Sequence, residues 1–383
     1  MAGRANSSSS WVVEMEKLLE DTRPSVEMER WKQRSIYRVP EFIKKMTNRD
    51  TYQPQFVSLG PLHHGEPHLV PMEEHKRRAV LHTRKPLTEF VAAIEEVADE
   101  LDAVYEDLDD RVNRGSFVQM MVTDGCFLIE LIMIDQSPEY KNTDYTDNDP
   151  IFSRSSFINL FPIMKNDVIA MENQIHLVVL QRILFVACNG TPPSAGEINN
   201  MVRSLLEVPL FEEGVEKLGL HFLDNFHKQR CGTTSHWEGS DKYEPRTPSA
   251  VELSEAMIQF KKSNTESIHD IDFKNGVLSM PMFTFHDQTE VELLNPMAFE
   301  WLHPDAKHDV RSKGFLVNMI GSDKVVVEMF NTLTKLVWTP DEGSKLGHMQ
   351  WKVNDHCRKR RNKWRAMFMN NYLSNPWVFI LRD

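Results

Sequence analysis

Cysteine is scarce in this chain. Its 383 residues include four cysteines, which lie far apart and form no C-x-x-C pair: Cys126, Cys188, Cys231 and Cys357. A dense disulfide framework requires many closely spaced cysteines, so the sequence excludes one. Cysteine usage of this kind is typical of proteins from a reducing compartment.

Long apolar runs are missing at both ends of the sequence. The first residues are small and polar, and Glu14, Glu16 and Lys17 soon interrupt the apolar positions that follow, so no secretory signal peptide is visible. Near the other end, the apolar run at residues 378–381 is far shorter than the roughly 20 residues that a membrane-spanning helix needs. We therefore expect the chain on the cytosolic side, either soluble or peripherally bound to a membrane.

Two kinds of binding motif are also absent. The 16 glycines form neither G-x-x-x-x-G-K-[ST] nor G-x-G-x-x-G, the loops that cradle phosphates. The net charge of −12 argues against nucleic acid as the general partner, because a phosphate backbone requires a positive protein surface.

With 41% apolar and 26% charged residues, the composition is that of a folded protein rather than a disordered one.

Apolar residues that recur every three or four positions predict a mainly helical protein. The two most apolar helices are expected at residues 117–134 and 168–186, and we interpret them as the buried centre. Further helices are expected at residues 11–19, 87–108, 250–262, 324–337 and 349–373. Short extended segments are expected at residues 35–39, 56–59, 271–273, 276–280 and 282–286. The predicted fold class is mainly α, that is, α+β with a small β element.

The predicted domain organisation has three parts. Residues 1–10 form a disordered N-terminal tail with four consecutive serines. Residues 11–373 form a single helical domain, with a soft loop at about 229–248 that is rich in glycine, serine and threonine. Residues 374–383 are expected to be the truncated start of a C-terminal membrane anchor.

Carboxylates in the apolar helices are the main candidates for catalysis. Asp124 and Glu130 lie within the first apolar helix, and Glu172 lies within the second. Buried carboxylates can have raised pKa values and act as general acids or bases. The alternative that we favour is a structural role, in which they pair with Arg182 or with helix ends, because an unpaired buried charge is costly. Cys126 is expected to be a core residue rather than a nucleophile.

Two clusters resemble metal sites in part. Five histidines lie close together: His63, His64, His68, His75 and His82. No cysteine is near them and no H-E-x-x-H motif occurs, so we expect them to shape a turn rather than to bind zinc. Three acidic residues recur in a second short stretch: Asp144, Asp147 and Asp149. They lack the glycine and the glutamate of a calcium loop, which favours a solvated loop, and no metal or cofactor is predicted.

The strongest local signal is a basic run. It consists of Arg358, Lys359, Arg360, Arg361, Lys363 and Arg365. Trp364 lies within the run and Trp377 follows it, and tryptophan favours the membrane interface. Each Lys or Arg near anionic lipid contributes about 1 kcal/mol to binding, so the run favours contact with an anionic membrane surface. A solvated helix face is the first alternative, and a nucleic-acid or nuclear-localisation patch is the second.

Several motifs together resemble the plant family called domain of unknown function 247 (DUF247). They lie at residues 36–40, 52–65, 71–76, 124–127, 148–152, 172–175, 273–278, 321–323, 362–366 and 372–377. The resemblance implies a helical domain that ends in a membrane helix at the plasma membrane, and it carries over no catalytic residue. This sequence departs from the family in three ways. It ends at Asp383, it has only residues 301–313 in place of a longer helical segment, and it has His176 where proline is usual.

These observations favour a non-enzymatic plant recognition or signalling protein with an unidentified protein partner. The resemblance further implies membrane tethering, and it includes family members implicated in self-incompatibility of grasses. Neither a small-molecule ligand nor nucleic acid is indicated. One alternative is an uncharacterised enzyme that uses Asp124, Glu130 and Glu172, and another is a truncated isoform that is non-functional or regulatory.

Overall fold

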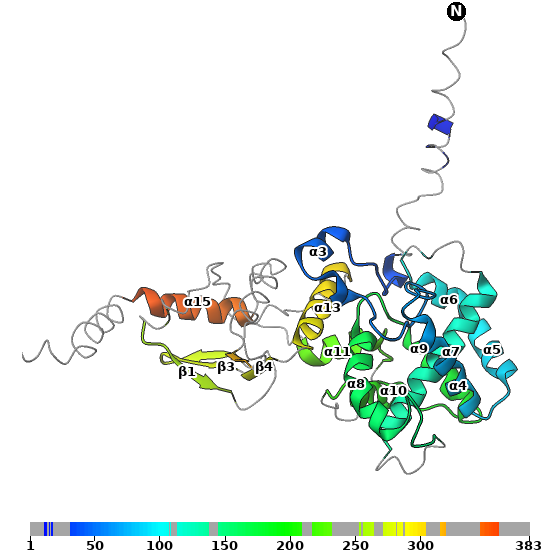
Figure 1. The fold of residues 1–383 in the computed structure, drawn as a ribbon. Coiled ribbons are helices and arrows are strands. Elements are labelled where there is room, and N and C mark those ends of the chain that lie inside the picture. Colours follow the sequence, from blue (N-terminus) through cyan, green and yellow to red (C-terminus); the bar gives the residue numbers. More distant parts are fainter. Residues whose placement is uncertain are drawn as a thin grey trace, which may run out of the picture.

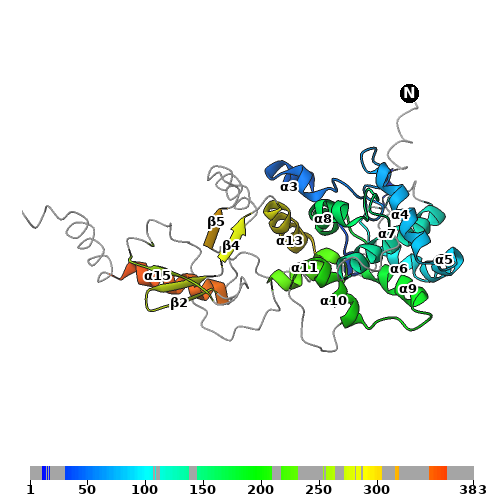
Figure 2. The ribbon, with the colours of Figure 1, turned by 60° about the horizontal axis from the view of Figure 1, so that its bottom comes forward.

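The computed structural model describes the chain in segments. They are residues 11–13, 15, 17, 31–106, 108, 113–137, 145–208, 217–231, 253, 256–263, 271–280, 282–285, 288–303, 315–318 and 345–359. Most of them build a body of packed helices, which we call the helical body. Three short strands and one helix, which we call the sheet unit, lie at one side of it (Figures 1 and 2).

The helices of the body are short, apart from α7 and α8. They are α3 (Glu41–Met46), the 3-10 helix η1 (Arg49–Tyr52), α4 (Val70–His82), α5 (Leu87–Glu95), α6 (Ala98–Ala103), α7 (Arg114–Asp135), α8 (Arg154–Ile169), α9 (Leu177–Ala187), α10 (Ala195–Leu205), α11 (Phe222–Cys231) and α13 (Thr289–Leu302). Polar N-caps begin several of them. Asn113, Ser153 and Ser194 each accept a hydrogen bond from a backbone N–H of the first turn of α7, α8 and α10.

Helix α7 is the centre of the helical body and packs against α4, α5, α9 and α10. It approaches α9 closely at Gly125, where a Cβ atom would lie 2.4 Å from Cδ1 of Ile183 and 2.7 Å from Cγ1 of Val179. Within the described part of the chain, α7 is the one helix long and apolar enough to cross a membrane, but 72% of its most apolar window is buried inside the molecule. The prediction of a buried helix at residues 117–134 is confirmed.

Two other predicted helices are wrong as continuous elements. The segment 87–108 breaks at Glu96 and Val97 into α5 and α6. Both helices pack on the same apolar core, so apolar residues recur every three or four positions across the break. The segment 168–186 is interrupted by a loop at residues 170–176 between α8 and α9. That loop is as buried as a core helix. An apolar run in the sequence does not distinguish a buried loop from a buried helix, so the prediction joined α8 and α9.

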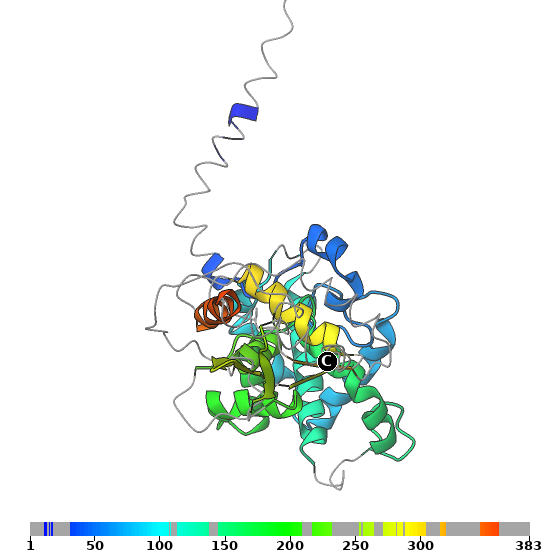
Figure 3. The same cartoon turned by 90° about the vertical axis from the view of Figure 1, so that its left-hand side faces the viewer.

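The sheet unit contains β1 (Gln259–Lys262), β2 (Asp272–Lys274) and β3 (Val277–Met280) in the order β1–β3–β2. Strand β2 pairs antiparallel with β3 across a two-residue turn, in which Asn275 and Gly276 both have positive φ, as the Asn-Gly hairpin turn requires. Strand β1 pairs parallel with β3. Helix α15 (Lys345–Arg358) lies along this sheet, and Figure 3 views the unit in front of the helical body.

A further pair of parallel strands, β4 (Met282–Phe285) and β5 (Phe315–Asn318), lies between the sheet unit and α13 in Figure 2. The predicted strands at residues 271–286 are therefore confirmed within the described residues. The prediction of a helix over residues 250–262 is wrong at residues 259–262, which form β1. The prediction of a strand at residues 56–59 is also wrong, because this extended segment pairs with side chains instead of with another strand.

Three apolar clusters form the interior. The largest joins α4, α5, α7, α9 and α10, a second joins α3, η1, α11 and α13, and a third lies between the sheet and α15. The predicted class, mainly α with a small β element, is confirmed. The tail at residues 1–10, the helix at residues 324–337 and the expected anchor at residues 374–383 lie outside the described residues, and so does most of the soft loop. The single-domain division stays a prediction.

Candidate functional site

The candidate site is built on two loops that meet inside the helical body. Residues 170–176 connect α8 to α9, and residues 53–69 connect η1 to α4. Neither loop contains a strand, so its buried backbone groups need side-chain partners. We call the side chains that supply these partners, together with the cations that pair with them, the polar network: Glu172, Asn173, Asp167, Asp124, Lys44, Lys76 and His63.

Glu172 joins three segments of the chain. Its Oε1 accepts a hydrogen bond from the backbone N–H of Val39 at 2.6 Å and lies 2.7 Å from Nζ of Lys44. Its Oε2 lies 3.2 Å from Nε2 of His63, whose Nδ1 lies 2.6 Å from Glu66. Burial opposes ionisation of Glu172, but the hydrogen bonds from His63 and Lys44 outweigh it, so the pKa of Glu172 is lowered. Glu172 is therefore an ionised carboxylate with partners on both oxygens.

Asp167 and Asn173 hold the 53–69 loop. The carboxylate of Asp167 accepts three successive backbone hydrogen bonds, from residues 55–57, at 2.7 to 2.8 Å. The amide of Asn173 accepts a hydrogen bond from the backbone N–H of Leu59 at 2.6 Å and donates one to the carbonyl of Val57 at 3.0 Å. Burial raises the pKa of Asp167 to about 6, although the three backbone hydrogen bonds favour its ionised form.

Asp124 and Lys76 join α7 to α4, and neither side chain is exposed. Asp124 accepts a hydrogen bond from the backbone N–H of Gly60 at 2.7 Å, and its other oxygen lies 2.7 Å from Nζ of Lys76. Lys76 also lies 2.6 Å from Glu73 and 3.2 Å from Oγ of Ser58. Burial raises the pKa of Asp124, and the neighbouring Lys76 opposes that shift. This ion pair extends the polar network to Glu73, near the surface.

Gly60 allows the two loops to approach each other. Its φ is +73°, a conformation that side-chain-bearing residues rarely adopt. A Cβ atom there would lie only 2.7 Å from the carbonyl oxygen of Gln174 and 2.9 Å from the hydroxyl of Tyr105. Glycine is therefore needed at this crossing.

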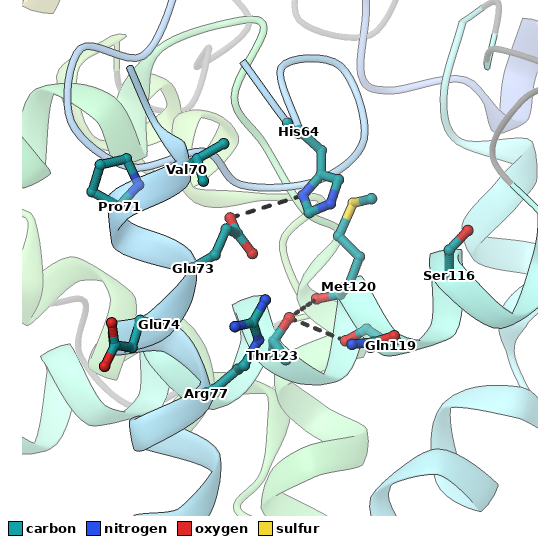
Figure 4. A pocket seen from close by; sticks show the side chains of 11 residues that line it. His64, Val70, Pro71, Glu73, Glu74, Arg77, Ser116, Gln119, Met120 and Thr123 are labelled. Carbon is teal, nitrogen blue, oxygen red and sulfur yellow. Dashed lines mark hydrogen bonds and ion pairs between the residues drawn. The ribbon is translucent and has the colours of Figure 1, made fainter. Parts of the chain in front are cut away.

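A cleft opens at the surface beside the polar network. It has a volume of about 530 Å³ and lies between the first half of α4 and the first half of α7, with the turn at residues 64–65 at one end (Figure 4). The cleft is lined by His64, Gly65, Val70, Pro71, Glu73, Glu74, Arg77, Ser116, Gln119, Met120 and Thr123. Glu73 connects the cleft to the polar network, because its Oε1 contacts Lys76 of the network and lies 3.8 Å from Nδ1 of His64 in the cleft.

The hydroxyl groups of the cleft are not arranged as nucleophiles. Ser116 donates its hydroxyl hydrogen to the carbonyl of Asn113 at 2.8 Å. Thr123 donates to the carbonyls of Gln119 and Met120 at 3.1 and 3.0 Å. Because backbone carbonyls hold both hydrogens, His64 activates neither hydroxyl in this arrangement. The cleft offers polar and apolar contacts to a bound group.

The predicted catalytic carboxylates do not converge on an open pocket. Asp124 and Glu172 are fully buried. Glu130 lies six residues after Asp124 on α7, and its carboxylate is 3.0 Å from His82. The predicted pairing with Arg182 is wrong, since Arg182 lies 3.2 Å from Glu96 near the surface. Lys76 of α4 pairs with Asp124 instead, and Lys44 of α3 pairs with Glu172. The core position predicted for Cys126 is confirmed, and burial raises its pKa to about 12.

The histidine cluster is dispersed by the fold. His63 is buried in the polar network, His64 lines the cleft and His82 stacks on Tyr145, with ring centroids 4.5 Å apart. Within the described residues, no group of three or more His, Cys, Asp or Glu side chains could hold a metal ion.

The prediction of a solvated loop is wrong at Asp149. Its carboxylate is buried, accepts hydrogen bonds from the backbone N–H groups of Ile151 and Phe152, and pairs with Arg78. Burial opposes ionisation of Asp149, but these contacts outweigh it, so the pKa of Asp149 is lowered. The carboxylate therefore shapes the start of α8 from inside the molecule.

Part of the predicted basic patch is described. Arg358 ends α15, and Lys359 follows it and lies 2.9 Å from Asp355. The other members, Arg360, Arg361, Lys363 and Arg365, lie outside the described residues, as do Trp364 and Trp377. The membrane role of the patch stays a prediction.

Sequence reasoning missed the cations of the site. Lys44, Lys76 and Arg77 lie on short helices, and only Lys44 and Lys76 are buried. One signal for Lys76 was available, because it follows Met72 by four residues and precedes Ala79 by three, on the buried face of α4. No comparable signal distinguishes Arg77 from other exposed arginines.

The sequence is similar to known plant proteins over most of its length. The model of the DUF247 family, described as "Plant protein of unknown function", matches residues 36–381. A UPF0481 protein of Arabidopsis thaliana is 25% identical over 400 aligned residues, which cover 90% of this chain and 82% of that protein. No solved structure matches the chain.

Proposed function

This chain belongs to the DUF247 family of plant proteins of unknown function, and from that membership and its site geometry we propose that it is a non-enzymatic recognition or signalling protein. Its role is to bind a protein partner at the cytosolic face of the plasma membrane. The resemblance to family members that end in a membrane helix supports this location.

One observation carries the proposal. The two carboxylates best placed for acid–base chemistry, Asp124 and Glu172, have no exposed surface and are held by lysines and backbone N–H groups. A general acid or base has to reach the proton that it transfers, within about 3 Å or through one water molecule. Carboxylates that are locked in this way support a structural role.

Substrate turnover tests the non-enzymatic part. The full chain and two variants, Asp124→Asn and Glu172→Gln, are assayed with a panel of ester, glycoside and phosphate substrates. We expect no turnover above that of heat-denatured protein. Turnover by the wild type that either variant abolishes, while circular dichroism shows that the variant is folded, would mean that the chain is an enzyme.

Membrane fractionation tests the location. The full chain is compared with a variant that carries alanine at Arg358, Lys359, Arg360 and Arg361. A control removes the same charge from exposed lysines elsewhere, through alanine at Lys45, Lys261, Lys262 and Lys274. We expect salt-sensitive membrane binding that the first variant loses and the control keeps, since each basic residue near anionic lipid contributes about 1 kcal/mol. Equal membrane binding by all three proteins would contradict a role for the basic run.

A finer proposal concerns the biological role. Resemblance to the grass members supports a pollen-side determinant of self-incompatibility, with a protein as its partner. Loss of the chain in pollen should then change which pollinations succeed. Unchanged compatibility in such plants would restrict the proposal to signalling outside pollination.

A further inference from the structure

We propose that the cleft between α4 and α7 binds a small organic acid, with the carboxylate of the ligand on Arg77 and its apolar part against Val70, Pro71 and Met120. This ligand site is independent of the proposed recognition function. It rests on the shape of the cleft, on an ion pair that does not form, and on the balance of charge around Arg77.

The size and lining of the cleft fit a small molecule. Its volume of about 530 Å³ lies within the range of roughly 300–1,000 Å³ that is typical of small-molecule sites. Val70, Pro71 and Met120 line it with apolar surface, and the polar lining comes from two helices and a turn: His64, Glu73, Glu74, Arg77, Ser116, Gln119 and Thr123. An apolar surface with a few placed polar groups is the usual composition of such a site.

An expected ion pair is missing at the centre of the cleft. Glu73 and Arg77 are four residues apart on α4, in the order that favours a helical Glu–Arg pair. Here Oε1 of Glu73 is held instead by Lys76 at 2.6 Å and by the hydroxyl of Ser58 at 3.1 Å. Within the described chain, the guanidinium of Arg77 has no ion pair. The polar network therefore removes the carboxylate that would otherwise neutralise Arg77.

The surrounding charges leave Arg77 as the group that meets a ligand. In Figure 4, Arg77 lies on the side of α4 that faces α7, whereas Glu74 points away from α7. Oε1 of Glu73 is held by Lys76, which Glu73 shares with Asp124, and His64 lies 3.8 Å from the same carboxylate oxygen. Asp124, the other partner of Lys76, is completely buried and does not reach the cleft.

A single carboxylate suits this arrangement better than other charged groups. The planar guanidinium of arginine matches a carboxylate through two parallel hydrogen bonds. A ligand cation would need a free acid that faces the cleft. Glu73 is held by Lys76 and Ser58, Glu74 points away from α7 in Figure 4, and the α7 side offers Ser116, Gln119, Met120 and Thr123. A phosphate dianion would need more than one cation, and Arg77 is the one Arg or Lys among the described residues that line the cleft.

Binding of chemical probes to the purified full chain tests the proposal. The probes are phenylacetate and octanoate, with phenylacetamide and phenethylamine as the neutral and cationic counterparts of phenylacetate. Titration calorimetry and ligand-observed NMR measure affinity. We expect both acids to bind, and the amide and the amine to bind at least about tenfold more weakly, because a hydrogen bond to a charged group is worth about 1.5–3 kcal/mol.

Three variants locate the site. Arg77→Gln should weaken binding of phenylacetate by about tenfold or more for the same reason. Arg182→Gln makes the same chemical change on α9, away from the cleft, and should leave the affinity unchanged. Gln119→Trp fills the cleft from an exposed position and should abolish binding. Arg77 and Gln119 are both exposed, so unchanged thermal melting would show that the variants are folded.

Several results would overturn the proposal. They are equal affinity of wild type and Arg77→Gln, binding of the amide as tight as that of the acid, unimpaired binding to Gln119→Trp, or no binding of either acid up to its solubility limit. None of these results affects substrate turnover or membrane fractionation. Failure here is thus distinct from failure of the proposed recognition function.

Discussion

The helical body and the sheet unit are stabilised in different ways. The body buries paired ionisable side chains, and Lys44, Lys76, Asp124 and Glu172 all lie within its interior. The sheet unit has a small apolar core, formed by Ala256, Ile258, Ile271, Phe273, Leu278, Met280 and Val353. Its interior contacts are therefore mostly non-directional, whereas those of the body depend on specific donor and acceptor positions.

This difference indicates what each region requires of its sequence. A buried ion pair is a poor source of stability compared with apolar packing, but removal of one partner leaves a charge that has no compensation. The body therefore tolerates few changes in its polar network. In the sheet unit, substitutions that keep volume and apolar character are tolerated well. Four experiments test this contrast.

The largest effect is expected from Glu172→Ala in the body. The change leaves Lys44 and the backbone N–H of Val39 without their acceptor inside the protein. We expect the free energy of unfolding to fall by about 3–5 kcal/mol, measured by urea denaturation. Glu172→Gln, which keeps an acceptor oxygen, should cost less. A loss below about 1 kcal/mol for the alanine variant would show that the polar network does not specify the body.

Phe273→Ala should affect the sheet unit alone. Phe273 of β2 is buried against α15, where its ring contacts His356, and removal of a buried phenyl ring typically costs about 3–5 kcal/mol. We expect about 3 kcal/mol, because a small unit near the surface relaxes around the lost ring. Hydrogen exchange should accelerate in residues 271–280 and 345–358 and stay unchanged in α7. Faster exchange in α7 would show that the two regions unfold together.

Acidification should separate the two regions through His227. This histidine lies in the body, between Glu300 and the ring of Phe299, and burial lowers its pKa from 6.5 to about 4. The unfolded chain thus binds a proton below pH 6.5 that the folded chain does not bind until about pH 4, so His227 destabilises the fold as the pH falls.

His227→Gln keeps a side-chain donor near Glu300 but does not titrate. Each unmatched proton is worth about 1.4 kcal/mol per pH unit. From pH 7 to about pH 5, the variant should therefore lose about 2 kcal/mol less stability than wild type. Denaturation at a series of pH values measures this difference. Parallel stability curves would show that His227 is accessible to protons in the folded state.

The smallest effect is expected at the surface of the body. Arg182 lies 3.2 Å from Glu96, and both side chains are partly exposed. An exposed ion pair contributes about 0–1 kcal/mol, so Arg182→Gln should change the free energy of unfolding by less than about 1 kcal/mol. A larger loss in urea denaturation would mean that surface pairs, and not only buried ones, hold the body together.

The sequence pattern predicted correctly those elements that have the same surroundings along their whole length. Residues 117–134 are apolar on nearly every side, and α7 is buried on nearly every side. The extended segments predicted at residues 271–273 and 276–280 form the paired strands β2 and β3. The 170–176 loop was missed because buried side chains satisfy its backbone, and a single sequence does not reveal those distant partners.

The sequence by itself determined the fold class, the central helix and the family. It also placed Asp124, Glu130 and Glu172 in the buried centre, which the structure confirms for Asp124 and Glu172 but not for Glu130, which is partly exposed. Only the tertiary structure decided that Lys76 and Lys44 pair with them, because α3, α4 and two loops bring together residues that are far apart in the chain. The same contacts hold Glu73 and leave Arg77 facing a cleft. A charge acts over a few ångströms, so its role depends on which groups the fold places beside it.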